Sequence, residues 1–282
     1  MSSLLDHAGL PVAFLTQHGK EKVVSPVLSE LGCTMHLVNH IDTDQFGTFT
    51  REIARPGNQL EAAREKARAG MTATGLRIGV ASEGSFAPDP YTGLFMWNVE
   101  VLLWVDDTRG IEVVGMAQGA GHCGQVCTDD WQVLESFARR MAFPEHHLVL
   151  RPHDEHDARV HKGISSWDAL RERFAACQHQ ASSRQVFAES DLRAFANPSR
   201  MRRIGEAAQN LLKRLRSICP VCEAPGYWVT GQEGNLPCGG CGLPTREPQA
   251  HIWQCVRCEH RVSRPRTDRR TADPQRCVHC NP

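Results

Sequence analysis

Eight cysteines near the end of the chain have the spacing that points most directly to chemistry. They form four Cys-x-x-Cys pairs, Cys219/Cys222, Cys238/Cys241, Cys255/Cys258 and Cys277/Cys280. A two-residue spacer lets both thiolates of a pair reach one ion from a tight turn, and two pairs complete a tetrahedral four-thiolate site. The cysteines therefore predict two structural Zn²⁺ ions in a double zinc ribbon. The spacing leaves open whether consecutive or interleaved pairs share an ion.

The alternative for these cysteines is a set of disulfides, which would need an oxidising compartment. Residues 1–10 contain no basic stretch followed by an apolar run, so the sequence shows no secretory signal. In a chain of the cytoplasm, Cys-x-x-Cys pairs at these spacings hold metal. We therefore expect a cytoplasmic, zinc-binding protein.

A second group of chemically capable residues lies in the first part of the chain. Glu83 follows an apolar run that predicts a buried strand, and ligands bind at the carboxyl ends of strands in open α/β sheets. Lys20 lies in the first predicted strand-to-helix turn, where backbone N–H groups and the helix dipole favour phosphate. Glu61 lies in the first turn of a predicted helix, where metal ligation and capping are both open.

Two further stretches each allow two interpretations. Residues 42–50 combine two carboxylates, three hydroxyls and two Phe rings. They either line a pocket, with Asp44 near a metal and a Phe ring against a base, or form a turn with Asx capping. Arg193 and Arg200 either clamp a phosphate at a helix that begins with Ser199 as its N-cap, or form salt bridges with neighbouring carboxylates. Two or three carboxylates with substrate phosphates would suit Mg²⁺.

The elements that must position these residues alternate between strand and helix. Short apolar runs predict strands, and apolar residues at helical spacing predict helices. The expected strands are 11–15, 35–38, 76–81, 99–105, 111–116 and 147–150, and the expected helices are 20–31, 58–73, 129–141, 166–177 and 199–216. Alternation with an antiparallel hairpin predicts a three-layer α/β domain with a mixed central sheet. We place this domain at 1–216 and the double zinc ribbon at 217–282.

Charge is distributed unevenly along the 282 residues, although the net charge is zero. From Ser199 onward there are 14 Lys/Arg and 7 Asp/Glu, a balance of +7, and the preceding part has a balance of −7. Two tetrathiolate zinc sites would lower the C-terminal balance to about +3. Nucleic acid is therefore a conceivable partner of the basic C-terminal region. Residues 261–276 are Arg-rich and apolar-poor, which predicts an exposed loop, and no apolar run is long enough to span a membrane.

Three segments, in this order, resemble the pyrophosphatases that hydrolyse inosine and xanthosine triphosphates. Residues 16–20, Thr-Gln-His-Gly-Lys, are similar to the Thr/Ser-x-Asn-x-Lys turn of that family, which implies that Thr16, His18 and Lys20 contact the triphosphate. Residues 59–67 are similar to its acidic helix ending in Lys-Ala, with Glu61 where a metal-binding Glu lies. Residues 79–86 are similar to its strand ending in a carboxylate, with Glu83 at the metal-binding or general-base position.

The chain also departs from that pattern. His18 stands where the family has Asn, and Ala62 stands where an Asn follows the helix Glu. These changes bear on base specificity and pyrophosphatase activity more than on the fold. As a whole, the chain is similar to a bacterial family that joins this kind of domain to cysteine-pair ribbons.

Two functions follow as expectations. The first is a Mg²⁺-dependent hydrolase of a nucleotide or related phosphoanhydride, in which Lys20 holds phosphate, Glu61, Glu83 and Asp44 serve metal and water, and Arg193 or Arg200 balances charge. The second is a non-catalytic protein that binds nucleotides, nucleic acid or another protein through its ribbons. Mg²⁺-dependent release of phosphate would distinguish the first from the second.

Overall fold

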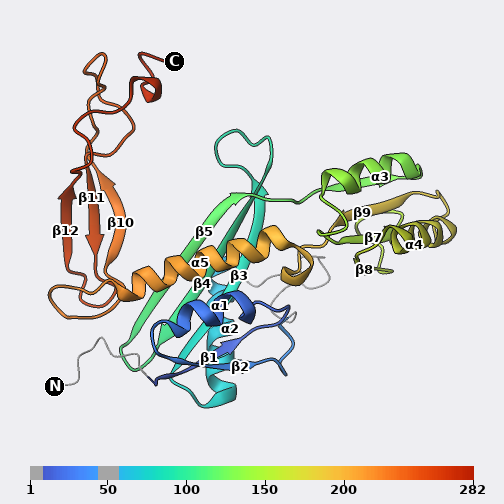
Figure 1. Ribbon diagram of the computed structural model, residues 1–282, viewed down its shortest axis with the longest axis horizontal. Coiled ribbons are helices and arrows are strands. Elements are labelled where there is room, and N and C mark those ends of the chain that lie inside the picture. Colours follow the sequence, from blue (N-terminus) through green and yellow to red (C-terminus); the bar gives the residue numbers. More distant parts are fainter. Residues whose placement is uncertain (1–8, 44–56) are drawn as a thin grey trace.

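A five-stranded mixed sheet forms the centre of the molecule (Figure 1). The structure is a computed structural model that describes residues 9–43 and 57–282. The strands are β1 (Pro11–Leu15), β2 (Thr34–Val38), β3 (Ile78–Pro88), β4 (Met96–Asp106) and β5 (Ile111–Ala120), in the order β2-β1-β3-β4-β5. β1 pairs in parallel with β2 and β3, and β3, β4 and β5 form an antiparallel meander. The predicted α/β class with a mixed central sheet is confirmed.

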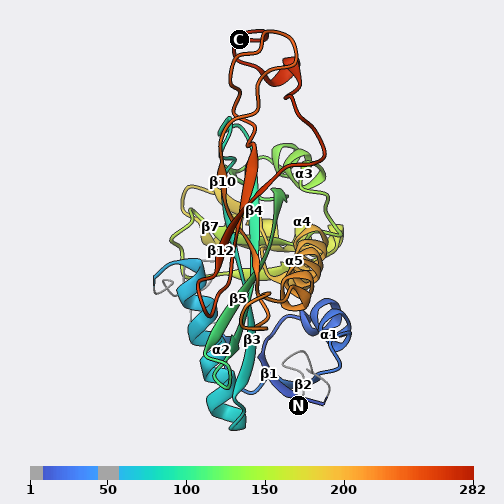
Figure 2. The ribbon, with the colours of Figure 1, turned by 90° about the vertical axis from the view of Figure 1, so that its left-hand side faces the viewer.

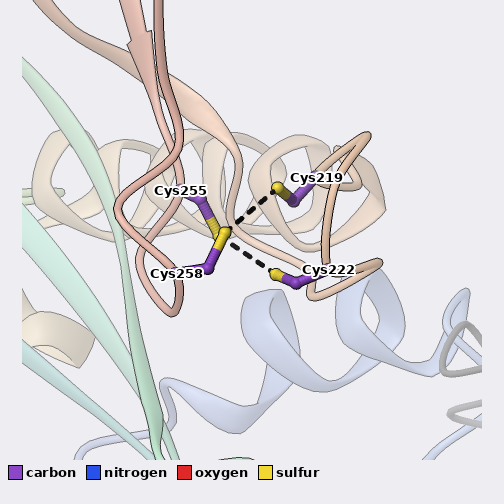
Figure 3. A group of neighbouring side chains, drawn as sticks. All are labelled: Cys219, Cys222, Cys255 and Cys258. Carbon is purple, nitrogen blue, oxygen red and sulfur yellow. Dashed lines mark hydrogen bonds between the residues drawn. The ribbon is translucent and has the colours of Figure 1, made fainter.

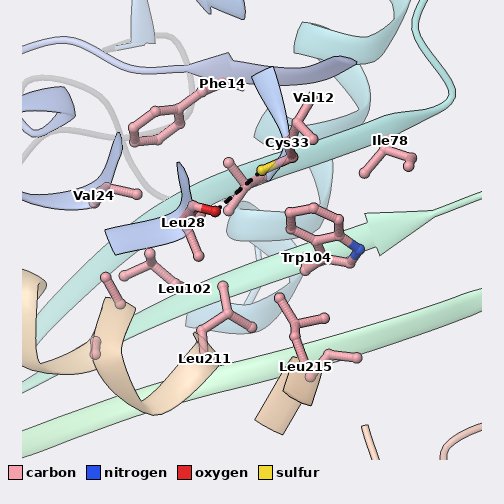
Figure 4. Packing of buried hydrophobic residues seen from close by; sticks show 14 of the residues in the cluster. Val12, Phe14, Val24, Leu28, Cys33, Ile78, Leu102, Trp104, Leu211 and Leu215 are labelled. Carbon is pink, nitrogen blue, oxygen red and sulfur yellow. Dashed lines mark hydrogen bonds between the residues drawn. The ribbon is translucent and has the colours of Figure 1, made fainter. Parts of the chain in front are cut away.

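Helices cover both faces of this sheet, because successive strand residues point to opposite sides. Val12 and Phe14 of β1 pack in a core with α1 (Glu21–Ser29) and α5 (Pro198–Arg216), as Figure 4 shows. Ala13, between them, belongs to a second core with α2 (Gln59–Thr74). The two cores make the three layers that the sequence predicts.

Local sequence fixes the ends of α2. The Asn58 side chain accepts from the backbone N–H groups of Leu60 and Glu61, and the Glu61 carboxylate accepts from the backbone of Asn58, which completes a capping box. Gly75, at φ 69°, ends the helix in the left-handed conformation. The predicted helix and its Asn58 cap are confirmed.

A second, four-stranded sheet was not foreseen within residues 1–216. It consists of β6 (Gln125–Thr128), β7 (Leu148–Pro152), β8 (His161–Ile164) and β9 (Val186–Ser190), in the order β6-β9-β7-β8. Helices α3 (Trp131–Arg140) and α4 (Trp167–Gln180) pack on it around a core of its own that includes Leu134, Leu148 and Leu170. Only β7 coincides with an expected strand, 147–150, and β6 and β8 have four residues each without an apolar run.

The short turn η2 (Ala194–Ala196) and helix α5 return the chain from the second sheet to the first, and α5 leads into an arm that projects from the body (Figures 1 and 2). The arm is an antiparallel sheet of β10 (Trp228–Glu233), β11 (Ala250–Gln254) and β12 (Arg261–Pro265), followed by the turn η3 (Pro274–Arg276). The first five residues of the predicted 261–276 loop are therefore a strand. None of the helices in 9–43 and 57–282 has the length and apolar character needed to cross a membrane.

Candidate functional site

Strand β3 extends well beyond the end of its parallel neighbour. β1 ends at Leu15 and pairs with β3 only around Gly79 and Val80, whereas β3 continues to Pro88. Beyond this point the edge of β3 faces the turn that joins β1 to α1. Lys20, at the N-cap of α1, fills the place of the missing strand by donating from Nζ to the Ser82 carbonyl at 3.2 Å.

Glu83 lies in the interior of β3, so the prediction that the strand ends before it was wrong. Gly84 and Ser85 resemble turn residues in the sequence, but both belong to the strand and pair with β4. The Glu83 carboxylate accepts from Lys66 Nζ of α2, and both side chains are buried. Gln59 donates to the Glu83 carbonyl at 2.8 Å, which ties the start of α2 to the same position.

A second buried ion pair lies on the opposite face of the sheet. Glu100 of β4 is aligned with Gly84, and its Oε1 accepts from Arg200 Nε at 2.7 Å and from Asn98 Nδ2 at 3.0 Å. Arg200 also donates to the Leu192 carbonyl. Only a residue without a side chain leaves room for this pair, because a Cβ at Gly84 would lie 2.5 Å from Arg200 Nη2 and closer still to Glu100 Oε1.

Lys20 interacts electrostatically with all four charged residues of the two ion pairs. Burial, together with the charges of Arg200 and Lys66, lowers the pKa of Lys20 to about 7, against the opposing effect of Glu83 and Glu100. With Lys20 protonated, this set of described residues holds three cations and two carboxylates. A buried group with surplus positive charge is stabilised by an anion.

An exposed aromatic ring lies next to this charged group. Phe195 of η2 is 47% exposed, and its ring centroid is 5.6 Å from that of His18, in the turn before Lys20. The guanidinium of Arg193 lies 4.8 Å from the same ring and is held by a bidentate ion pair with Asp191. The salt-bridge interpretation of Arg193 is thus confirmed. His18 adopts φ 67°, a left-handed conformation that is uncommon outside glycine.

The other predicted residues are more scattered. Thr16 is buried at the end of β1, where its hydroxyl donates to the Gln17 carbonyl at 3.3 Å. Glu61 is exposed, and its carboxylate serves the capping box. Lys66 lies five residues further along α2 on the buried face of the helix, so the two side chains do not share a face. Asp44 lies outside the described residues. The structure therefore brings Lys20, Glu83 and Arg200 together, and not Glu61.

The start of α5 differs from the prediction by two residues. Asn197, not Ser199, is the N-cap, and its side chain accepts from the Arg200 backbone at 3.0 Å. Pro198 explains the difference, since proline favours the first helical position and so places its predecessor at the cap. Ser199 instead has its hydroxyl 3.0 Å from His146 Nε2.

Glu100, Lys66 and Phe195 are functional candidates that the sequence did not single out. Glu100 carried a usable signal, because it is the one charged residue in the apolar run 99–105. Lys66 belongs to the Lys-Ala end of the acidic helix, and that motif alone assigns the lysine no role of its own. Nothing in the local sequence of Phe195 shows that its ring is exposed beside His18.

The eight paired cysteines form two groups that could each hold a metal ion. Cys219, Cys222, Cys255 and Cys258 form one group, which Figure 3 shows, and Cys238, Cys241, Cys277 and Cys280 form the other. The ligand atoms in each group lie within 4.8 Å of one another. The pairs are therefore interleaved. All cysteines of the chain lie in its described part, and none is in a disulfide.

The path of the arm explains the interleaving. β10 runs away from α5 and β11 returns, so the pair before β10 meets the pair after β11 at the base of the arm. The pair between β10 and β11 meets the last pair at the tip, beyond β12. The base group lies close against the body. The backbone at Gly226 approaches β5 so closely that an added Cβ would lie 2.9 Å from the Val113 side chain.

The chain matches a model of a protein family. A family model described as a domain of unknown function, DUF6671, matches residues 66–282. The match includes Lys66, Glu83, Glu100, Arg200 and all eight paired cysteines, and it begins after Lys20. No curated protein matches the chain.

Proposed function

The chain belongs to the DUF6671 family, and we propose that this member is a Mg²⁺-dependent hydrolase of a nucleotide or related phosphoanhydride. The observation that carries the proposal is the buried charged group around Lys20 at the end of β1, which holds more cations than carboxylates when Lys20 is protonated. A phosphate is the anion that such a set of lysine and arginine side chains recognises best.

The phosphoryl group would lie beyond the end of β1, in the plane of the sheet. Side chains from both faces converge there, with Lys20 at the edge of β3, Lys66 on the α2 side and Arg200 on the α5 side. The positive end of the α1 dipole adds to the attraction. Because Arg200 is already held by Glu100, it is preorganised to stabilise charge that develops in the transition state.

Glu83 is the residue we assign to the metal and to the attacking water. Mg²⁺ is commonly held by one or two carboxylates together with substrate phosphates and several waters, so a single buried carboxylate beside a phosphate site fits it. When bound, the ion would neutralise phosphate charge and lower the pKa of a water. Glu100 cannot share this role, because it lies on the other face of the sheet; it positions Arg200.

The exposed ring of Phe195 supports a nucleotide over a simpler phosphoanhydride. Aromatic side chains stack bases regardless of sequence, since every base has a π-face. Phe195 lies beside His18, two residues from Lys20, so a base against this ring would be near its own phosphates. The Arg193 guanidinium at the same ring adds a cationic contact.

We assign zinc to the two cysteine groups. A tetrahedral site with Zn–S bonds of about 2.3 Å has sulfur atoms about 3.8 Å apart. In the structure the Sγ–Sγ distances are 3.7 Å for Cys219–Cys258 and 3.6 Å for Cys222–Cys255. In the tip group they are 3.7 Å for Cys238–Cys280 and for Cys241–Cys277. Free thiols held this way need a reducing compartment, which favours the cytoplasm.

The test is release of phosphate and pyrophosphate from a panel of canonical and deaminated nucleoside triphosphates, with Mg²⁺ and with the metal chelated. Turnover that requires Mg²⁺ supports the hydrolase and identifies the base. Nucleotide binding without turnover under all conditions would overturn the hydrolase and favour a non-catalytic nucleotide-binding protein.

A further inference from the structure

One face of the arm sheet carries aromatic and basic side chains that the proposed reaction does not use. The register aligns Val229 of β10 with Trp253 of β11 and Val262 of β12, so these three side chains share a face. Two residues along each strand, the same face continues. It adds Tyr227, His251, His260 and Arg264 and, past the β-bulge of β10, Gln232 opposite His251.

Four of these side chains, Tyr227, Trp253, His260 and Arg264, form one contiguous group of ring and cation–π contacts. The Tyr227 ring lies 5.6 Å from Trp253 and 5.9 Å from His260, with the His260 ring nearly parallel at 26°. The Arg264 guanidinium covers two rings at once, at 4.9 Å from the Trp253 centroid and 5.4 Å from that of Tyr227. Arg264 is exposed, so its outer surface is available for stacking.

The base cysteine group holds this face in position. Cys219 and Cys255 pack in one small core with Tyr227 and Trp253, so the rings that form the platform also line the first metal site. The sheet stands clear of the body in Figure 1. The Tyr227 ring is buried, so the members of this preorganised platform that a ligand can reach are the partly exposed Trp253, His251 and His260 and the exposed Arg264.

We propose that this face binds single-stranded nucleic acid. Unpaired bases stack on aromatic rings and on arginine guanidinium planes, while duplexes hide those base surfaces. Arg264, His251 and His260 supply donors for the adjoining phosphates. The two valines of the face are small, and its other members are aromatic, basic or, in Gln232, a polar amide, which suits bases and phosphates better than an apolar protein segment.

Charge supports stacking as the main source of affinity. Residues 217–282 hold 8 Arg against 6 Asp and Glu, and the metal-bound thiolates add further negative charge. The arm therefore has no basic stripe, and we expect a shallow salt dependence, equivalent to about one or two phosphate contacts. The face shares no residue with the charged group around Lys20, so this inference stands or falls separately from the hydrolase.

The experiment measures fluorescence anisotropy of short labelled oligo(dT) and oligo(rU) with the full, zinc-loaded chain at low salt. Arg264→Ala and Arg261→Ala form a matched pair, because both residues are exposed on β12 and lie on opposite faces. Each change removes one positive charge. We expect Arg264→Ala to weaken binding by about fivefold or more and Arg261→Ala by about twofold or less.

Arg264→Lys separates stacking from charge, because lysine keeps the charge and lacks the planar group. We expect it to weaken binding nearly as much as Arg264→Ala, with the zinc content of every variant unchanged. The proposal is overturned if the wild type does not bind, if duplex binds as tightly as single strands, if Arg261→Ala and Arg264→Ala lose equally, or if Arg264→Lys binds like the wild type.

Discussion

Glu83 and Glu100 lie on adjacent strands but on opposite faces of the central sheet, and each is held by its own cation. Glu83 pairs with Lys66 of α2, and Glu100 pairs with Arg200 of α5, with all four side chains buried. Helices from both outer layers are thereby joined at the point where β1 ends and Lys20 begins α1. In our account this junction is both a structural clamp and the phosphate site.

The clamp predicts a large stability loss when one partner is removed. Glu100→Gln leaves Arg200 buried without its carboxylate, and breaking a buried pair costs about 3–5 kcal/mol. The control is Glu112→Gln, which breaks the partly exposed Arg64–Glu112 pair (side chains 35% and 30% exposed), for an expected loss of about 1 kcal/mol or less. Urea unfolding of the two variants measures the difference, and equal losses would contradict the clamp.

Gly84 is predicted to be intolerant of even one methyl group. Gly84→Ala would force the Glu100–Arg200 pair away from the sheet, since the new Cβ would lie 2.5 Å from Arg200 Nη2. We expect a loss of about 1–3 kcal/mol, as for other overpacked sites. Gly205→Ala is the control, because in α5 the nearest atom to the new Cβ is 3.7 Å away. It should be neutral or stabilise the helix by up to about 1 kcal/mol in thermal or urea unfolding.

Lys20 predicts a specific pH dependence of stability. Its folded-state pKa of about 7 is below the ordinary value of 10.5, so between these values the unfolded chain binds more protons than the folded one. The free energy of unfolding should therefore gain a contribution that rises from about pH 7 to about pH 10.5. Lys20→Met should remove that rise. An unchanged slope in the variant would show that another group causes it.

The same group predicts how anion affinity varies with pH. An anion favours the protonated amine, so affinity for pyrophosphate should fall above pH 7 by as much as about tenfold per pH unit. Calorimetric titration gives the affinities of wild type and Lys20→Met at each pH. Their ratio is independent of the ionisation of pyrophosphate, which affects both proteins equally. A constant ratio of the two affinities across pH 6–9 would exclude Lys20 from the anion site.

Zinc stoichiometry tests the interleaved pairing. Cys222 and Cys255 belong to one group, and Cys222 and Cys241 to different groups. The double change Cys222→Ser/Cys255→Ser should lower the zinc content from two ions to one, whereas Cys222→Ser/Cys241→Ser should remove both. Native mass spectrometry reads the count directly. Consecutive pairing would give the reverse result.

Much of the central domain could be predicted from sequence because its signals are local. The apolar run at 11–15 is β1, and the Asn58 cap and Glu61 mark the start of α2 as observed. The end of β3 was misjudged because Gly84 resembles a turn residue. Its actual role, leaving room for Glu100 and Arg200, depends on a contact between positions that are far apart in the sequence.

The arm shows the same limit. The Cys-x-x-Cys spacing identifies eight ligands, but their pairing depends on β10 and β11 forming a hairpin that carries each pair to one end. β12 is mostly exposed and rich in arginine, so the pattern of a half-buried strand is absent from it. The second sheet was not predicted because β6 and β8 have only four residues each, and because the place of β7 in a separate sheet depends on its pairing with β9, a strand not expected from the sequence.

The most direct test of the account compares Glu83→Gln with Glu61→Gln in Mg²⁺-dependent phosphate or pyrophosphate release from the best nucleotide of the panel. Each variant replaces one carboxylate by its amide. Glu83 is a buried member of the charged group, and Glu61 is an exposed capping residue. We predict that Glu83→Gln loses at least about a hundredfold in kcat and that Glu61→Gln stays within about threefold. Full activity of Glu83→Gln would contradict the central claim.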